Sequence, residues 1–197
     1  MQLHRVLKRL MDEAYRMLIC GIPGVVASRS ISLRGRPIVT VYPGSSIELG
    51  DRVSIISNSS DTALGVNRAT ILRTLSQEAR IVIGADTGIS GGVICASAAV
   101  LIGKRCLLGA NVTIFDTDFH PVDAVPRRYM GTDFAIRKEV VIEDDVFIGT
   151  GSIVMKGVRI GSGSVIGAGS IVSANIPANV VAAGNPCRVV RPLRLGS

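Results

Sequence analysis

The sequence predicts an all-β fold, a parallel β-helix built from a repeat of six residues. Aliphatic residues stand at every sixth position over the second half of the chain: Ile142, Ile148, Val154, Ile160, Ile166 and Val172. Four positions after each of these comes a small or β-branched residue: Val146, Ser152, Val158, Ser164, Ser170 and Ile176. Hydrophobic residues make up 47% of the chain, although it has no Trp and only 4 Phe and 3 Tyr. A core filled by Val, Ile, Leu and Ala suits a narrow, regular interior.

A period of six matches neither the helical period of 3.6 nor the strand period of 2. It predicts a short strand followed by a corner, and three such units close one triangular turn. The aliphatic residue then points inward at the same place in every turn, and each turn buries its face only against its neighbours. Gly149, Gly161 and Gly167 follow the aliphatic residue, and glycine tolerates the backbone angles of tight corners.

An earlier block of the repeat contains a slip of one residue: Ile83, Ile89, Cys95, then Ile102, Leu108 and Ile114. In this register Cys95 and Cys106 occupy inward positions, where Cys packs as a small hydrophobe. A fainter start of the repeat lies at Leu49 and Ile55. The segment 57–80 has no clear phase, so the number of coils before Ile83 stays open.

We expect three parts: an N-terminal amphipathic helix with its linker (1–30), a β-helix domain (31–191) with an inserted loop at about 116–140, and a C-terminal tail (192–197). Seven apolar residues form a helical stripe in the first part: Leu3, Val6, Leu7, Leu10, Met11, Ala14 and Leu18. We favour a helix packed on its own coil or within an oligomer, with a peripheral membrane-surface helix as the alternative. The apolar run that follows is too short to span a bilayer.

Charge and cysteine content restrict the function classes. The net charge of +7 suits an anionic ligand. However, the sequence contains no recognisable nucleic-acid-binding motif, and it has few aromatic residues for base stacking. The four Cys are widely spaced and form no CxxC pair, and the chain opens on a basic helical pattern rather than a signal peptide. We therefore expect a cytoplasmic protein with reduced thiols that does not bind nucleic acid.

The repeat stops after Ile114 and resumes at Ile142, and an insertion of this length in a compact repeat is usually functional or disordered. The insertion carries His120, preceded by Asp116 and Asp118. A neutral imidazole, with an ordinary pKa of about 6.5, can take a proton from a hydroxyl group. His120 is therefore the candidate general base. Asp116 and Asp118 are candidates for orienting its ring, or equally for shaping the turn through backbone amides.

Three stretches resemble the hexapeptide-repeat acyltransferases, especially the maltose and galactoside O-acetyltransferase branch. They are LGANVTIFDTDFHP (108–121), VFIGTGSIVMKGVRIGSGSVIGAG (146–169) and IPANVVAAGNPCRVVR (176–191). The resemblance covers roughly residues 49–191. It implies a left-handed coil, a homotrimer, acetyl-CoA in the cleft between adjacent subunits, and a catalytic His followed by Pro, which falls on His120.

The resemblance also implies the cofactor contacts: Gly149, Thr150, Ala168, Ser173 and Arg191. It suggests that the backbone N–H of Thr150 stabilises an oxyanion, and Arg191 can pair with a phosphate. The chain departs from the branch at Phe147, where Trp is usual, and at Ala174, where Lys is usual. These departures affect acceptor identity and cofactor affinity more than the type of reaction.

Four residues are candidates for binding the acceptor. Ser90 and Asn111 lie in the turns that lead to His120 and can hydrogen-bond to sugar hydroxyls, with corner formation as the alternative. Phe147 can contact the acceptor, and Arg127, beside Arg128, can bind an anionic one. We therefore expect an acetyl-CoA-dependent O-acetyltransferase that acts directly on a sugar or a surface-polysaccharide precursor.

Three other functions are weighed against this one. An N-acetyltransferase that acts on an amino sugar, free or nucleotide-linked, would use the same fold and depend less on a base. A non-catalytic trimeric scaffold would need neither the loop His nor the cofactor segments. A γ-type carbonic anhydrase needs three His, whereas this chain has only His4 and His120, so we expect no metal.

Overall fold

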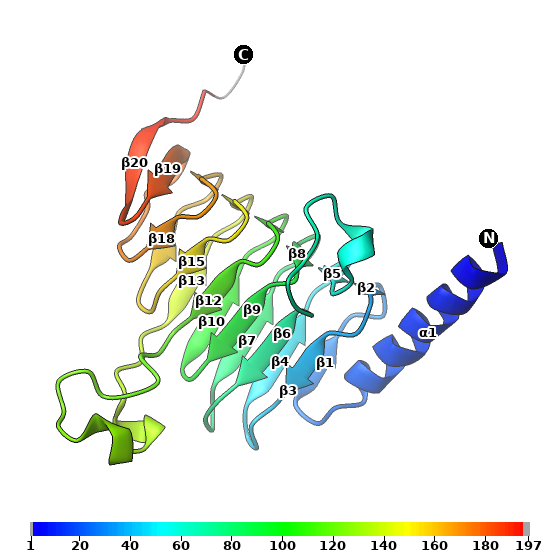
Figure 1. Cartoon of the computed structure of the whole chain (residues 1–197), viewed down its shortest axis with the longest axis horizontal. Coiled ribbons are helices and arrows are strands. Elements are labelled where there is room, and N and C mark those ends of the chain that lie inside the picture. Colours follow the sequence, from blue (N-terminus) through cyan, green and yellow to red (C-terminus); the bar gives the residue numbers. More distant parts are fainter. Residues whose placement is uncertain (1, 195–197) are drawn as a thin grey trace.

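The computed structural model describes residues 2–194, which form one helix followed by a triangular coil of short strands (Figure 1). The strands line three sheets along the coil, named here sheets A, B and C. Neighbouring strands are parallel throughout the described sheets, except that β19 and β20 are antiparallel. The predicted fold class, a left-handed parallel β-helix with an N-terminal helix and a long inserted loop, is confirmed.

The sheets take their strands from every third position along the chain. Sheet A contains β1 (Val25–Ala27), β4 (Ser46–Leu49), β7 (Arg80–Ile83), β10 (Ala99–Ile102), β13 (Val140–Ile142) and β16 (Arg159–Ile160). Sheet B contains β2 (Ser32–Arg34), β5 (Ser54–Ile56), β8 (Gly88–Ser90), β11 (Leu107–Leu108), β14 (Phe147–Ile148), β17 (Val165–Ile166), β19 (Val180–Gly184) and β20 (Cys187–Pro192). Sheet C contains β3 (Ile38–Thr40), β6 (Ile71–Thr74), β9 (Val93–Ala96), β12 (Thr113–Phe115), β15 (Ile153–Val154) and β18 (Ile171–Val172).

The six-residue register predicted for the second half is confirmed. Ile160 pairs with Ile142 one turn below, and Ile166 pairs with Ile148 below and with Ala182 above. All six aliphatic positions from Ile142 to Val172 are at most 1% exposed. The six small or β-branched positions from Val146 to Ile176 are buried as well. Side chains of both sets therefore fill the interior of every turn.

The register predicted around Cys95 is wrong. Ile94, not Cys95, points inward and pairs with Ile114 of the next turn, whereas Cys95 is only partly buried. The reason is a short corner: the left-handed residue Gly91 (φ +56°) comes two residues after the inward Ile89, whereas in the next two coils Asn111 and Gly151 come three residues after Leu108 and Ile148. A longer corner between Ile94 and Ile102 restores the phase. Cys106 does lie inside the coil.

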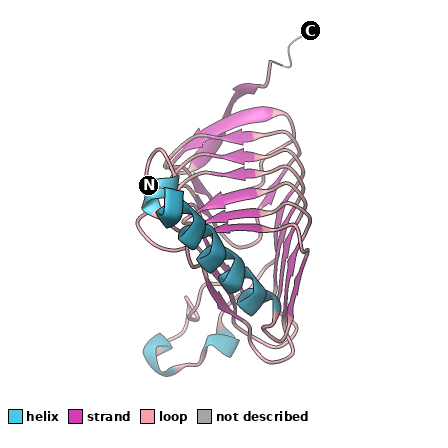
Figure 2. Cartoon of the chain, turned by 90° about the vertical axis from the view of Figure 1, so that its right-hand side faces the viewer, coloured by secondary structure: helices cyan, strands magenta, loops and turns pink. Residues whose placement is uncertain are grey.

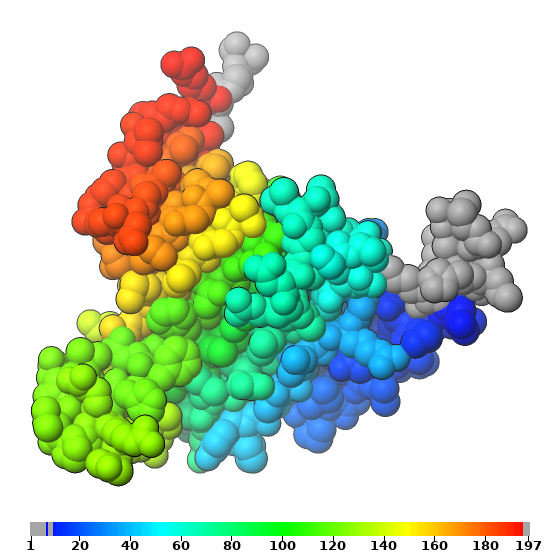
Figure 3. All heavy atoms as spheres, in the orientation of Figure 1, coloured from blue at the N-terminus to red at the C-terminus, as the bar shows by residue number. Residues whose placement is uncertain are grey.

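Two coils precede Ile83. The inward positions of sheets A, B and C are Ala27, Leu33 and Val39 in the first coil and Leu49, Ile55 and Leu72 in the second. The unphased segment contains a loop, 57–70, that leaves the coil between β5 and β6 and includes the short helix η1 (Ser59–Asp61). It bulges from the surface in cyan in Figure 3.

Helix α1 (Gln2–Cys20) lies across the N-terminal end of the coil (Figures 1 and 2). Ile19 is buried in the core, and the Tyr15 hydroxyl donates to the Pro37 carbonyl at 3.0 Å. The backbone N–H of Gly35 donates to the Asp12 carboxylate at 3.2 Å. The helix therefore packs on its own coil through the side that carries Asp12, Tyr15 and Ile19.

The apolar stripe predicted from the sequence lies on another side of α1. Leu7, Leu10, Met11 and Leu18 are 56%, 62%, 47% and 67% exposed. The prediction that the helix packs on its own coil thus holds for the helix but not for these residues. No helix among the described residues has the length and apolar character needed to span a membrane.

The long loop leaves the coil after β12 and returns at β13. Its stem is closed by an antiparallel bridge between Thr117 and Arg137 and by a hydrogen bond from the Asp118 N–H to the Ile136 carbonyl at 3.1 Å. Two short helices lie beyond the stem, η2 (Arg127–Tyr129) and η3 (Thr132–Phe134). The loop projects from the side of the coil in Figures 1 and 3.

Candidate active site

Five of the candidate residues lie on the corner between sheets B and C, named here the B–C edge. Ser90, Thr150 and Ala168 occupy equivalent corner positions, Asn111 lies one position further along its own corner, and Gly149 precedes Thr150. The Asn111 N–H donates to the Ser90 carbonyl at 2.9 Å, and the Thr150 hydroxyl donates to the Ala110 carbonyl at 2.7 Å. The backbone hydrogen bonds of the coil thus stack the predicted acceptor residues directly below the predicted cofactor residues.

Packing explains the glycine at position 149. A Cβ added to Gly149 would lie 2.5 Å from the backbone nitrogen of Ala168 in the coil above. The Thr150 N–H, in contrast, has no acceptor among the described residues. It is therefore available to a ligand oxygen, as the predicted oxyanion role requires.

The other group lies at the corner between sheets C and A, named here the C–A edge. It contains Asp116, Asp118 and His120 at the start of the long loop, and Ser173, exposed, after β18. The side chain of His120 is exposed and forms no hydrogen bond with any described residue. Its imidazole is accessible to an acceptor molecule.

Asp116 has the contacts of a turn-shaping residue. Its carboxylate is fully buried and accepts hydrogen bonds from the backbone N–H groups of Ser97 at 2.7 Å and Ala98 at 2.6 Å. Burial raises the pKa of this carboxyl above its ordinary value, while the backbone donors act in the opposite direction. Both oxygens are occupied by the corner after β9, so the contacts favour shaping of this turn over orientation of His120.

Asp118 forms an ion pair with Lys156, a residue that the sequence pattern does not single out. The Lys156 Nζ lies 2.7 Å from a carboxylate oxygen of Asp118, and the two side chains are 22% and 13% exposed. Lys156 follows β15, one coil above the loop. The pair therefore fastens the loop to the next coil two residues before His120.

Phe119 continues this turn with a left-handed backbone (φ +61°). Its N–H donates to the Thr117 hydroxyl at 3.2 Å, and its ring packs against Phe115, with centroids 5.6 Å apart. An ion pair, a ring contact and a hydrogen bond thus fix the direction in which the chain presents His120.

Asn111 has a second partner that sequence reasoning missed. The backbone N–H of Asn67, in the 57–70 loop, donates to the Asn111 Oδ1 at 2.8 Å. The same loop covers Gly91, where an added Cβ would lie 2.6 Å from Val66. Because a backbone N–H can only donate, the Oδ1 of Asn111 is occupied and its NH₂ group remains to donate to a ligand.

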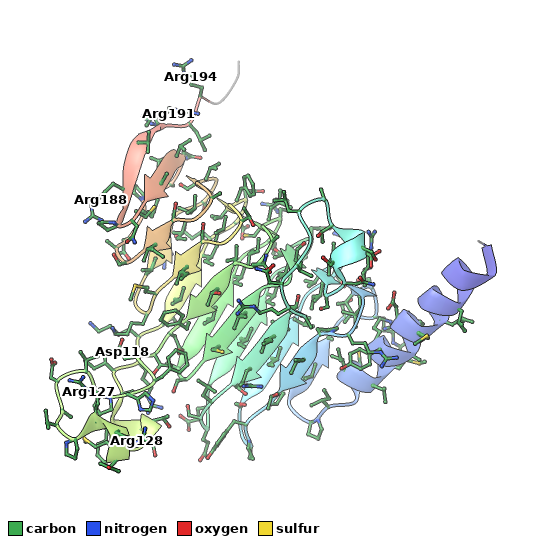
Figure 4. The ribbon with its side chains drawn as sticks, viewed as in Figure 1. Asp118, Arg127, Arg128, Arg188, Arg191 and Arg194 are labelled. Atoms are coloured by element: carbon green, nitrogen blue, oxygen red, sulfur yellow. The ribbon has the colours of Figure 1, made fainter. Side chains whose placement is uncertain are left out.

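The remaining predicted residues lie apart from these two groups. Figure 4 places Arg188 and Arg191 on the C-terminal hairpin, Arg194 on the tail after β20, and Arg127 and Arg128 on the long loop. Arg191 is exposed and donates to the Pro192 carbonyl at 3.0 Å. Phe147 is 43% exposed on the outer face of sheet B, next to Leu107 of the coil below. The structure of one chain does not bring Arg127 and Arg191 together.

The B–C and C–A edges lie on opposite sides of sheet C. Asn111 precedes β12 and Asp118 follows it, so the width of sheet C lies between the two edges, and β12 alone spans roughly 10 Å at about 3.3 Å per residue. His120 and the Thr150 N–H are therefore too far apart within one chain to act on the same atoms. A site that uses both edges needs two chains.

The short-range patterns of the sequence contain no signal for Lys156 or Asn67. Their partners are 38 and 44 residues away along the chain. Lys156 also follows an inward repeat position, Val154, where a polar corner residue is ordinary.

Two other features lie outside these edges. A cleft of about 430 Å³ is lined by Glu143, Arg159, Gly161, Asn175, Ile176, Pro177 and Ala178 at the corner between sheets A and B. It contains none of the candidate residues. The described residues contain no cluster of His, Cys, Asp and Glu that could hold a metal ion. Burial raises the pKa of the Cys95 and Cys106 thiols, which disfavours a nucleophilic thiolate at either position.

Two family descriptions match the repeat. Residues 139–174 match "Bacterial transferase hexapeptide (six repeats)", and residues 99–115 match "Hexapeptide repeat of succinyl-transferase". The repeat region of the chain is therefore similar to the hexapeptide-repeat transferases. The likeness to the galactoside and maltose O-acetyltransferase branch inferred from the sequence is confirmed by its relatives.

A galactoside O-acetyltransferase of Lactococcus lactis is 49% identical over 48% of this chain and 44% of its own length. The chain spans about half the length of the curated relatives it matches. A hexapeptide-repeat acetyltransferase of Vibrio cholerae, solved with acetyl coenzyme A, is 25% identical over 98% of this chain and 84% of its own, with a TM-score of 0.56. A galactoside acetyltransferase solved with coenzyme A is 26% identical over 95% of this chain and 81% of its own, with a TM-score of 0.54.

Proposed function

We propose that this protein is an acetyl-CoA-dependent O-acetyltransferase that acts on a hydroxyl group of a sugar or a surface-polysaccharide precursor. The observation that carries the proposal is the presentation of His120, exposed and unpaired, on a turn fixed by Lys156 and Phe115. The relatives support the cofactor, because two solved ones hold acetyl-CoA or coenzyme A. The galactoside O-acetyltransferase from Lactococcus lactis supports a sugar acceptor.

The proposed reaction is a direct transfer without a covalent enzyme intermediate. His120 takes the proton of the acceptor hydroxyl, and the oxygen attacks the thioester carbonyl carbon. The Thr150 N–H donates to the oxyanion of the tetrahedral intermediate. When that intermediate collapses, the carbon–sulfur bond breaks and His120 returns the proton to the thiolate of coenzyme A. The NH₂ group of Asn111 donates to an oxygen of the acceptor.

This reaction needs at least two chains, because His120 and Thr150 lie on different edges of one chain, and we propose that the protein forms a homotrimer. In a closed three-fold ring, the C–A edge of each subunit can face the B–C edge of the next. Three clefts then each receive His120 from one subunit and Asn111 and Thr150 from its neighbour. The outward apolar side chains of Leu107 and Phe147, 57% and 43% exposed, are suited to such an interface.

We place the protein in the cytoplasm. All four Cys are free thiols, which suits a reducing compartment.

The experiment that tests the proposal is release of free thiol from acetyl-CoA across a panel of sugars, amino sugars and nucleotide sugars. His120→Ala should lower turnover roughly 10²–10⁴-fold with little change in acetyl-CoA binding, because the imidazole contacts only the reacting atoms. Arg191→Ala should instead raise the KM for acetyl-CoA and leave turnover nearly unchanged, because it removes uniform binding. An almost fully active His120→Ala would indicate transfer to an amine. Absence of acetyl-CoA binding by the parent protein would leave a non-catalytic trimeric scaffold as the remaining function.

A further inference from the structure

The outward side of α1 is an apolar surface that the chain itself does not cover. Leu7, Leu10, Met11 and Leu18 follow one another at helical spacing and are 47–67% exposed. Met17 borders them and is 60% exposed. A contiguous apolar helix face of this kind marks an interaction site in a folded protein.

The position of the helix determines which way this apolar surface faces. The opposite side of α1 is docked on the first coil by Ile19, Tyr15 and Asp12. Because α1 crosses the N-terminal end of the coil (Figure 2), its apolar side points away from the coil, beyond that end of the molecule. In the three-fold assembly of the proposed function, neighbouring coils pack side by side and leave this end uncovered. Three such surfaces would then lie at one end of the trimer.

Charge decides which partner fits. The chain carries a net charge of +7. Arg29, Arg34 and Arg36 are exposed on the first coil, next to the helix, and none of the three forms an ion pair with a described acidic side chain. A second trimer would bring the same cations together, whereas an anionic lipid surface would neutralise them.

We propose that the outward face of α1 binds the surface of an anionic membrane, with the apolar side chains in the headgroup region and the arginines of the first coil against lipid phosphates. This inference rests on the proposed function for its three-fold assembly. It also deepens that function, because it makes a membrane-linked hydroxylated glycan the acceptor class. One helix binds a membrane weakly and reversibly, whereas three helices on one trimer bind together and raise the overall affinity.

The experiment is sedimentation of the full-length protein with vesicles of phosphatidylcholine alone or mixed with phosphatidylglycerol. The protein should bind the mixed vesicles and be released by high salt. Leu10→Ser with Leu18→Ser should weaken binding by roughly tenfold or more, because two apolar side chains no longer insert into the headgroup region. Arg34→Glu with Arg36→Glu should weaken it roughly fivefold or more, and only on the anionic vesicles. The matched control is Leu64→Ser, a leucine 75% exposed on the 57–70 loop.

Thiol release with a soluble acceptor, measured on the same proteins, separates this inference from the proposed function. The helix variants should keep that activity. Equal binding of the leucine variants and the parent, or no sedimentation of the parent, would overturn the membrane contact and leave the enzyme intact. A hexamer that Leu10→Ser with Leu18→Ser converts into a trimer would show instead that a second copy covers the helix.

Discussion

The contacts of single residues decide how His120 is presented. The imidazole has no partner of its own among the described residues, so its place depends on the backbone turn before it. That turn is fixed by the Asp118–Lys156 ion pair and by packing of Phe119 on Phe115. Lys156 is therefore a positioning residue, which acts on His120 through Asp118.

Lys156→Met should lower kcat roughly 10- to 100-fold, because even a small displacement of the His120 imidazole slows the reaction. The KM for acetyl-CoA should change little, since Lys156 lies away from the B–C edge. Lys156→Arg should retain most of the activity because it keeps the cation. Lys104→Met, at an exposed lysine on another corner, is the control. Steady-state kinetics give the comparison, and an equal loss in Lys156→Met and Lys104→Met would contradict the positioning role.

Asp116→Ala should lower the free energy of unfolding by about 1–3 kcal/mol, because the buried N–H groups of Ser97 and Ala98 lose their acceptor. Burial raises the pKa of Asp116 in the folded state. Its contribution to stability is therefore fully present below its ordinary pKa and decreases as the pH rises through the raised value. Denaturant unfolding should show a larger difference between parent and variant at about pH 4 than at neutral pH. A difference that grows with pH would contradict this assignment.

The sequence predicts inward residues well because a period of six determines them locally. It does not predict the partners of Asp118 and Asn111, because those contacts depend on how successive coils stack. Whether Asp116 orients His120 or shapes the turn can be decided only from the backbone N–H groups that donate to its carboxylate, and the sequence does not show these. The exposed stripe of α1 was visible in the sequence, but which side of the helix meets the coil was not.

At the scale of elements, the 57–70 loop is the feature that most extends the candidate site. It lies against the B–C edge at Gly91 and orients the amide of Asn111 through Asn67. The sequence shows this segment only as a break in the repeat. The error at Cys95 has a related origin, because the left-handed corner at Gly91 shortens the repeat at the same place.

Gly91→Ala should displace this loop, since the added Cβ would meet Val66 at 2.6 Å and the residue has a φ of +56°. We expect a loss of about 1–2 kcal/mol in unfolding free energy from the left-handed backbone. The KM for the acceptor should rise several-fold, with the KM for acetyl-CoA nearly unchanged. Gly131→Ala is the matched control, because no atom lies within 4 Å of its added Cβ. An unchanged KM for the acceptor in Gly91→Ala would show that the 57–70 loop takes no part in acceptor binding.

At the scale of the whole molecule, one chain carries two incomplete halves of a site. The B–C edge holds Asn111 and the Thr150 N–H, and the C–A edge holds His120, with sheet C between them. The coil makes this separation unavoidable, because equivalent corners stack along straight lines. The central claim of the proposed function is that adjacent subunits bring the two halves together.

Subunit mixing tests that claim most directly. His120→Ala and Asn111→Ala should each be nearly inactive alone, and trimers reassembled from an equal mixture should recover about a quarter of the parental activity, because one interface in four then has both residues intact. The fraction of mixed trimers is checked by mass spectrometry, and thiol release from acetyl-CoA measures activity. Mixed trimers that form but remain as inactive as either variant would contradict a site shared between subunits.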